Sequence, residues 1–419
     1  MSELTYEQLR DAVSGGAVAL RSRTELQPAE GPGGKVFPPT YAVNASHKYA
    51  VETRHVRDPE SGDREVQTVL LDSVASQANR AELALLEGWE LGELQFPVPF
   101  VDFATDNGEF DDIGRITVLE APHRLADAIF RDSMLEGSLF RLSDLGRAIT
   151  DAQPHNATAL FRCSPTALLF GQWDSTGPKG GLGSKFQRAY VSEIVGEDAV
   201  VGKGVASRID PLQIEKASAT VYEHQDSDQR WTLEPSEAAT EKGKPKQVGK
   251  GTDLGRPSQV NHGNVTPGFD KSADGNVISG GVTIACAVQT TVVSLAALRR
   301  LKFAGHDRAA QVDARTAIAA LGVAAIAYQH EMDFDLRSRC LLIPEHEPRV
   351  ELVGRDGSPA EPVDVSREAA ASIVADAAQA AADASIGWAT GEIRLVPAPK
   401  LLELLRRSRE VSAREVPGE

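Results

Sequence analysis

The sequence predicts an α+β fold, and three observations lead to this class. Short runs of alternating or continuous apolar residues, such as 48–55 and 65–71, are typical of β-strands. Longer stretches, such as 313–328 with its apolar residues at helical spacing and the alanine-rich 366–385, indicate helices. The composition, with 41% hydrophobic and 25% charged residues, is ordinary for a globular protein with a buried core.

Caps and turns divide the chain into short elements. Thr5 suits the N-cap of a first helix, and Asp72 or Ser73 caps a second helix that ends at Gly88. The polar turn DPESGD between two strand patterns predicts a hairpin. The expected elements are, in chain order, a helix at 5–13, strands at 17–26, 48–55 and 65–71, a helix at 73–88, a strand at 116–120, helices at 121–136 and 142–150, a strand at 158–170, a short helix from 184, strands after 196 and at 280–288, helices to 301 and at 313–328, strands at 340–343 and 349–353, a helix at 366–385, a strand at 392–396 and a helix at 400–410.

Length and charge limit the classes of protein that the chain can represent. A chain of 419 residues can form two or three domains or one elaborated domain, and no internal repeat divides it. The formal net charge of −16 argues against a protein that coats nucleic acid indiscriminately, but it leaves room for one local basic groove. The N-terminus has no signal-peptide pattern and no apolar run is long enough for a membrane span, so we expect a cytoplasmic protein without membrane contact. Three widely spaced cysteines supply no zinc motif.

The stretch from Leu168 to Gly196 combines glycines with basic residues. An apolar strand leads into a glycine-rich loop, which carries cations and no acid between Ser175 and Ser192. Ser184 and Gln187 form a capping-box signature, which predicts a helix that begins at about residue 184 and ends at Gly196. Exposed N–H groups, a helix N-terminus and cations are the components of an anion site. The candidate residues of this stretch are Lys179, Gly181, Gly183, Ser184, Lys185 and Arg188, whereas the helical period places Phe186 and Tyr190 in the core.

Two familiar phosphate motifs do not fit this loop. A P-loop requires lysine before serine, but Ser184 precedes Lys185. A dinucleotide fingerprint requires a third glycine where Phe186 stands. The chain also has neither G-x-S-x-G nor H-x-x-x-H, so no hydrolase scaffold is visible and no metal or cofactor is expected. The alternative to an anion site is a glycine-rich surface loop whose lysines bind nothing.

Further polar groups could extend an anion site. The helix at 73–88 carries Gln77, Asn79 and Arg80, which can bind sugar and phosphate oxygens or form an ordinary solvated face. Lys203 lies between glycines, and Arg208 follows it. The polar stretch 217–280, which carries a second basic cluster (Lys242, Lys244, Lys246 and Lys250), is expected to form hairpin arms or loops.

Six ordered parts of the sequence together carry a family resemblance. They are LLDSVASQANR (70–80), LFGQWDSTGPKGGLGSKFQRAYVSEIVG (169–196), VGKGVASRIDPL (201–212), PSQVNHGN (257–264), GGVT (280–283) with SLAALRRLKF (294–303), and DFDLRSRCLL (333–342). These blocks resemble the RAMP-superfamily backbone subunit of type I-U (also called I-G) CRISPR surveillance (Cascade) complexes.

This resemblance implies an RRM-like, ferredoxin-type palm with inserted thumb and finger subdomains. Residues 1–419 would form one elaborated palm domain, with 213–262 as the thumb insertion and 366–419 as a helix-and-strand extension of the palm. Such subunits polymerise along the spacer of a guide RNA (crRNA), grip its backbone, and leave its bases free to pair with a target DNA strand in antiviral defence. The implied partners are crRNA, the target strand, other copies of the chain, and the large and repeat-end subunits of the effector complex.

The resemblance implies a non-catalytic RNA-binding role for the candidate cations, glycines and amides. Trp173 is a candidate for stacking on a base, although a core or interface position is an equal alternative. The rival hypothesis is a RAMP-type endoribonuclease, because related folds include RNA-cleaving enzymes that use histidine or metal-bound aspartate. Its candidate residues are His47 and Asp174.

Overall fold

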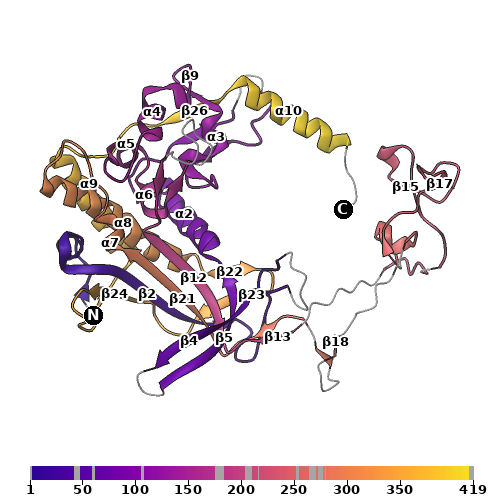
Figure 1. Ribbon diagram of the computed structural model, residues 1–419, viewed down its shortest axis with the longest axis horizontal. Helices are drawn as coiled ribbons and strands as arrows, with labels where there is room; N and C mark the ends of the chain where they lie inside the picture. Colours follow the sequence, from indigo (N-terminus) through magenta and orange to yellow (C-terminus); the bar gives the residue numbers. More distant parts are fainter. Residues whose placement is uncertain are drawn as a thin grey trace. The chain divides into compact units, whose positions relative to one another are not determined.

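The computed structural model has the α+β fold that the sequence predicts (Figure 1). The structure describes residues 2–41, 48–58, 62–104, 108–174, 184–202, 210–215, 217–251, 254–263, 270–271, 277–278 and 280–414.

The chain divides into two compact units. The first comprises Met1–Asn44, Lys48–Val200 and Val282–Ala398, and the second comprises Val201–Gly281 and Pro399–Glu419 together with 45–47. The expected insertion 213–262 lies inside the second unit, which begins earlier and ends later. The expected C-terminal extension 366–419 is divided between the units after Ala398.

A large sheet forms the centre of the first unit. Its neighbouring strands are antiparallel, apart from the short parallel pair β1–β25. The hairpin of β4 and β5 confirms the prediction made from the turn DPESGD. The order across the sheet is β1 (Ser2–Glu3), β25 (Glu361–Asp364), β24 (Arg349–Gly354), β2 (Ala17–Pro28), β21 (Cys286–Ser294), β12 (Tyr190–Glu197), β5 (Gly62–Asp72) and β4 (Val51–Asp58), and the hairpin of β22 (Phe334–Arg337) and β23 (Cys340–Pro344) joins it through β2.

Helices cover one face of this sheet (Figure 1). Ser73, one of the two expected caps, begins α2 (Val74–Glu90). The expected alanine-rich helix forms as α9 (Arg367–Asp383), which Ser366 caps. Between them α8 (Arg308–Glu331) is buried almost throughout. Among the described helices, α8 is long and apolar enough to cross a membrane, a segment that the sequence analysis did not identify. However, 89% of its apolar window is buried inside the protein.

Several other expected elements also form. The capping box of Thr5 starts α1 (Tyr6–Asp11), which a π-helical turn (Ala12–Gly16) extends toward β2. A second, smaller sheet has the strand order β7-β6-β26-β8-β9, and Figure 1 shows its strands β26 and β9 near α3 and α4. The remaining elements of the first unit include β3 (Lys35–Val36), β6 (Phe100–Asp102), β7 (Arg115–Thr117), α3 (Ala128–Arg131), β8 (Ser133–Leu135), β9 (Ser138–Leu139), α4 (Asp144–Thr150), α7 (Leu295–Leu298) and β26 (Arg394–Pro397).

The expected strand at 158–170 is wrong. This segment forms two helices, α5 (Thr158–Cys163) and α6 (Pro165–Phe170), with Pro165 in the first turn of the second. Every residue of α6 is buried. A short apolar run has the same pattern in a buried strand and in a buried helix, so periodicity alone could not separate the two. The expected helix at 121–136 is also wrong, because only a 3₁₀ turn (Arg124–Ala126) and α3 form before β8.

Short hairpins make up much of the second unit. β14 (Tyr222–Glu223) pairs with β15 (Trp231–Thr232), and β16 (Thr240–Glu241) pairs with β17 (Lys244–Pro245). Val221 and Ala238 are buried there, and α10 (Pro399–Arg414) belongs to the same unit. In the second basic cluster Lys246 forms an ion pair with Glu223, whereas the other three lysines are exposed.

Candidate nucleic-acid interface

Two short paired strands lie on either side of the glycine-rich loop. β10 (Gln172–Trp173) and β11 (Lys185–Phe186) are antiparallel, with Trp173 opposite Lys185, and the amide of Asp174 donates to the carbonyl of Ser184 at 2.9 Å. The helix predicted to begin at residue 184 is therefore wrong. The chain continues instead into β12, because pairing with β5 and β21 satisfies the backbone that a helix would otherwise have used.

The predicted burial of this segment holds, although its secondary structure differs. Phe186 and Tyr190 are both buried, as expected, and the ring of Tyr190 lies 5.0 Å from that of Phe170. Gly196 is a strand residue rather than a helix cap. A Cβ atom there would lie 2.5 Å from a methyl group of Ile284, so close packing between neighbouring segments excludes any larger side chain.

Lys185 and Trp173 form an exposed basic and aromatic pair. The ammonium nitrogen of Lys185 lies 5.0 Å from the centroid of the Trp173 ring, and 54% of Trp173 is exposed. Lys185 has no ion pair with any described residue. The cation–π contact holds the ammonium group beside a flat apolar surface. A phosphate and a base or ribose could bind such a pair together.

Arg188 is the second exposed cation of this surface. Its side chain packs against Gly171, where an added Cβ would lie 2.9 Å from Cγ of Arg188. Gly171 also has a φ of +84°, which favours glycine. Beneath it, the carbonyl oxygen of Gly171 accepts a hydrogen bond of 2.9 Å from Arg124. The backbone at Gly171, just before β10, is thus held in place by the partly buried Arg124.

A buried ion pair supports this turn from α2. Arg124 donates two hydrogen bonds, of 2.6 and 2.8 Å, to the carboxylate of Glu82. Burial raises the pKa of Glu82 to about 7, while the charges of Arg124 and Arg188 act in the opposite direction. The guanidinium of Arg188 therefore lies within the electrostatic reach of α2, although it remains exposed.

An apolar cavity of about 290 Å³ opens beside Lys185. Gln187 and Arg300 also line it, and Leu168 and Leu298 form part of its apolar wall. Arg300 is exposed and has no ion pair with any described residue. Arg300 is not among the residues predicted from the sequence, although it lies in the block SLAALRRLKF. Arg300 and Lys185 line the same cavity because α7 and the residues after it meet residues 185–189, and no local sequence pattern predicts this contact.

Two of the predicted site residues, Ser184 and Arg80, are not free on the surface. Ser184 is fully buried, so its hydroxyl group does not lie on the surface with Lys185. Arg80 forms hydrogen bonds within the protein, to Asp72 at 3.0 Å and to the carbonyl oxygen of Leu336 at 2.7 Å. By contrast, Asn79 is exposed.

Gln77 belongs to a buried polar network instead of a solvated or ligand-binding face. None of its surface is exposed, and its amide nitrogen donates to Asp72 at 2.6 Å. Its amide oxygen accepts from Ser192 at 3.1 Å, from Gln289 at 2.9 Å and from Gln329 at 3.0 Å. This network connects α2, β12, β21 and α8. Gln77 therefore lies in the core and not at the candidate interface.

The remaining predicted site residues lie outside the described residues. They are Lys179, Gly181, Gly183, Lys203 and Arg208, together with His47 of the nuclease hypothesis.

Asp174 is described, and it forms an ion pair of 2.6 Å with Arg141 while only 5% of its surface is exposed. Within the described ranges, no group of three metal-ligating side chains includes Asp174.

Part of the chain matches a known protein family. Residues 20–201 match the family model described as CRISPR-associated protein GSU0053. No curated protein matches the chain. The matched range includes Trp173, Lys185 and Arg188 and ends where the second unit begins. The chain is thus similar, over residues 20–201, to the CRISPR-associated proteins of this family, and this similarity supports a role in CRISPR defence.

Proposed function

We propose that the chain is a non-catalytic, crRNA-binding backbone subunit of a CRISPR surveillance complex. The observation that carries this proposal is the exposed set of Lys185, Arg188 and Trp173, whose two cations form no ion pair with a carboxylate of the described residues, in a chain of net charge −16. A locally basic surface beside an aromatic ring suits a single-stranded polyanion. The family match over residues 20–201 supports the CRISPR context.

The order of the strands supports an RRM-like palm. Along the chain β2, α2, β12, β21, α8 and β24 follow one another as β-α-β-β-α-β, with insertions between them. Across the sheet the four strands stand in the order β24-β2-β21-β12, and all three neighbouring pairs are antiparallel. The second unit contains the segment proposed as the thumb, and its exposed lysines would be available for RNA.

Contacts at this surface would favour RNA in general over any particular sequence. Cations that bind phosphates carry no base information. The apolar cavity beside Lys185 and Arg300 could cover one face of a ribose or base without reading its edge. A subunit that accepts variable spacers requires contacts to phosphates and to ring faces that do not depend on the base.

We further propose that the subunit belongs to a type I-U (I-G) complex and that several copies polymerise along the spacer, which pairs with target DNA. Its other proposed partners are the large and repeat-end subunits, and its proposed location is cytoplasmic.

The endoribonuclease hypothesis has weaker support from the described residues. Asp174 is buried, and its carboxylate is already paired with Arg141. A metal-binding or base-catalytic aspartate needs an oxygen that the substrate or ion can reach. Incubation with labelled repeat RNA, with and without Mg²⁺, tests this alternative, because discrete products would favour the enzyme.

The proposal is tested by the binding of two unrelated single-stranded RNAs of equal length. We expect equal affinities for the two RNAs, and a large loss for both in the double variant Lys185→Ala/Arg188→Ala. A double variant that binds both RNAs as the unmodified chain does would contradict the assignment of the interface. Strong discrimination between the two RNAs would contradict the backbone-binding role.

A further inference from the structure

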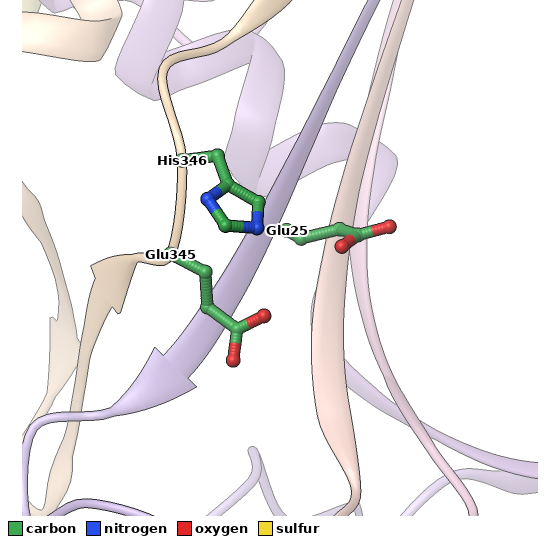
Figure 2. A group of neighbouring side chains, drawn as sticks. All are labelled: Glu25, Glu345 and His346. Atoms are coloured by element: carbon green, nitrogen blue, oxygen red, sulfur yellow. The ribbon is translucent and has the colours of Figure 1, made fainter.

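A second group of polar side chains lies on the large sheet, outside the nucleic-acid interface. Glu25 comes from β2, whereas Glu345 and His346 follow directly after β23 (Figure 2). One ligand atom from each of the three residues lies within 4.8 Å of the other two. Donor atoms at this spacing can surround one ion, because ligands on opposite sides of a metal are separated by about twice a metal–ligand distance of roughly 2.0–2.3 Å.

The backbone fixes the two glutamates as neighbours. The pairing of β2 with β23 places Leu26 opposite Pro344, and the next amide, that of Glu345, donates to the carbonyl of Glu25 at 2.9 Å. Like charges that face one another across paired strands repel. A cation between these carboxylates would remove that repulsion.

The three residues lie where the strand that pairs with β2 changes. β2 pairs with β24 from Ala17 to Arg23 and with β23 from Leu26 to Pro28, so its neighbour changes at Glu25. The chain that connects these two neighbours begins with Glu345 and His346. An ion bound here would join the connection to β2 at the position where the backbone pairing changes.

The surrounding charges are mainly negative. Arg23 pairs with Oε1 of Glu25 at 2.5 Å, which leaves the second carboxylate oxygen available. Next to this group, burial raises the pKa of the Cys286 thiol to about 11, and the charges of Glu197, Glu25 and Glu345 add to that rise, which Arg23 only partly offsets. Three carboxylates therefore act on the Cys286 thiol.

We propose that Glu25, Glu345 and His346 form a binding site for one divalent first-row transition-metal ion of the zinc class. The imidazole favours such ions over Mg²⁺ and Ca²⁺, which prefer oxygen ligands throughout. Two carboxylates neutralise the charge of the ion. Three protein ligands leave at least one position for water, so the site is open. The ion stabilises the connection between β23 and β24, and this role is independent of RNA binding.

The test is calorimetric titration of Zn²⁺ into the full chain after removal of metals with a chelator. We expect one Zn²⁺ site that is weakened more than about tenfold in His346→Ala and in Glu25→Gln, since even changes outside the ligand set cost about this much. Glu347→Gln, an exposed change at the next residue, is the matched control and should retain the affinity.

A second measurement keeps the result independent of folding defects. Zn²⁺ should raise the thermal midpoint of the unmodified chain and of Glu347→Gln, but not that of His346→Ala, because binding to the folded state stabilises it. Identical Zn²⁺ titrations of the unmodified chain and His346→Ala would overturn the site. Tighter binding of Mg²⁺ than of Zn²⁺ would overturn the metal class.

Discussion

The ammonium nitrogen of Lys185 lies 5.0 Å from the centroid of the Trp173 ring, directly across the β10–β11 ladder. The two side chains come from strands on either side of the glycine-rich loop, and both remain exposed. A charge and a flat ring are therefore presented together to solvent, and the exposed Arg188 follows three residues after Lys185, just before β12.

Trp173→Ala should weaken the binding of single-stranded RNA by about 1 kcal/mol or more, through loss of stacking and of the surface that orients Lys185. Trp173→Phe, which keeps an aromatic face, should retain most of the affinity. Fluorescence anisotropy with labelled RNA measures both. Equal affinities of Trp173→Ala and the unmodified chain would show that the ring takes no part.

The double variant Lys185→Ala/Arg188→Ala should also change the salt dependence of RNA binding. Each cation removed from a single-stranded site lowers the slope of log K against log salt by about 0.7, because fewer counterions are released. The charge-preserving variant Lys185→Arg/Arg188→Lys is the control and should keep the slope. A slope that is unchanged in the alanine variant would mean that these cations do not contact phosphate.

Gln77→Leu should lower the free energy of unfolding substantially, by about 2 kcal/mol or more. The change leaves the amide donors of Gln289 and Gln329 without their acceptor, and each buried unsatisfied group costs about 1–3 kcal/mol. The hydroxyl group of Ser192 keeps Thr291 as a partner. Asn79→Ala, an exposed change on the same helix, should stay within about 0.5 kcal/mol. Urea denaturation measures the difference, and equal midpoints for the two variants would contradict the structural role of the network.

The stability of the folded state should depend on the protonation of His330 at acid pH. Burial lowers the pKa of its imidazole from 6.5 to about 4, so between these values the unfolded chain binds more protons than the folded chain. The stability that depends on neutral His330 is present above about pH 6.5 and is lost as the pH falls toward 4. The buried carboxyl of Glu82, whose pKa is raised to about 7, acts with the opposite sign in an overlapping range.

The contribution of His330 is isolated by comparison with His330→Gln. The unmodified chain should lose more unfolding free energy than this variant between pH 7 and pH 4.5, measured by chemical denaturation at each pH. Parallel curves for the two proteins would show that the imidazole is not held neutral in the folded state.

Local signals in the sequence predicted the local structure well. Thr5 and Ser73 each cap the helix that follows them, because a cap depends only on the next few residues. The same kind of signal was misleading at Ser184, where strand pairing with distant segments overrides a capping-box pattern. Burial of Phe186 and Tyr190 was predicted correctly, since an apolar face is buried in either structure.

Contacts that join distant segments could not be predicted. Gln77 is polar and sits on a helix with other polar groups, but its partners lie 115, 212 and 252 residues away, so its burial has no local signal. The cluster of Glu25 with Glu345 and His346 depends likewise on the pairing of β2 with β23. Arg300 joins Lys185 at one cavity only after α7 meets residues 185–189.

The central claim, that many copies of the chain bind one guide RNA through the Lys185 and Arg188 surface, is tested most directly by mass photometry of the chain mixed with crRNA. The proposal predicts discrete particles that contain several chains per RNA, and only free chain or shorter assemblies for Lys185→Ala/Arg188→Ala. Free chain alone in the unmodified sample, or full-length assemblies in the double variant, would contradict it.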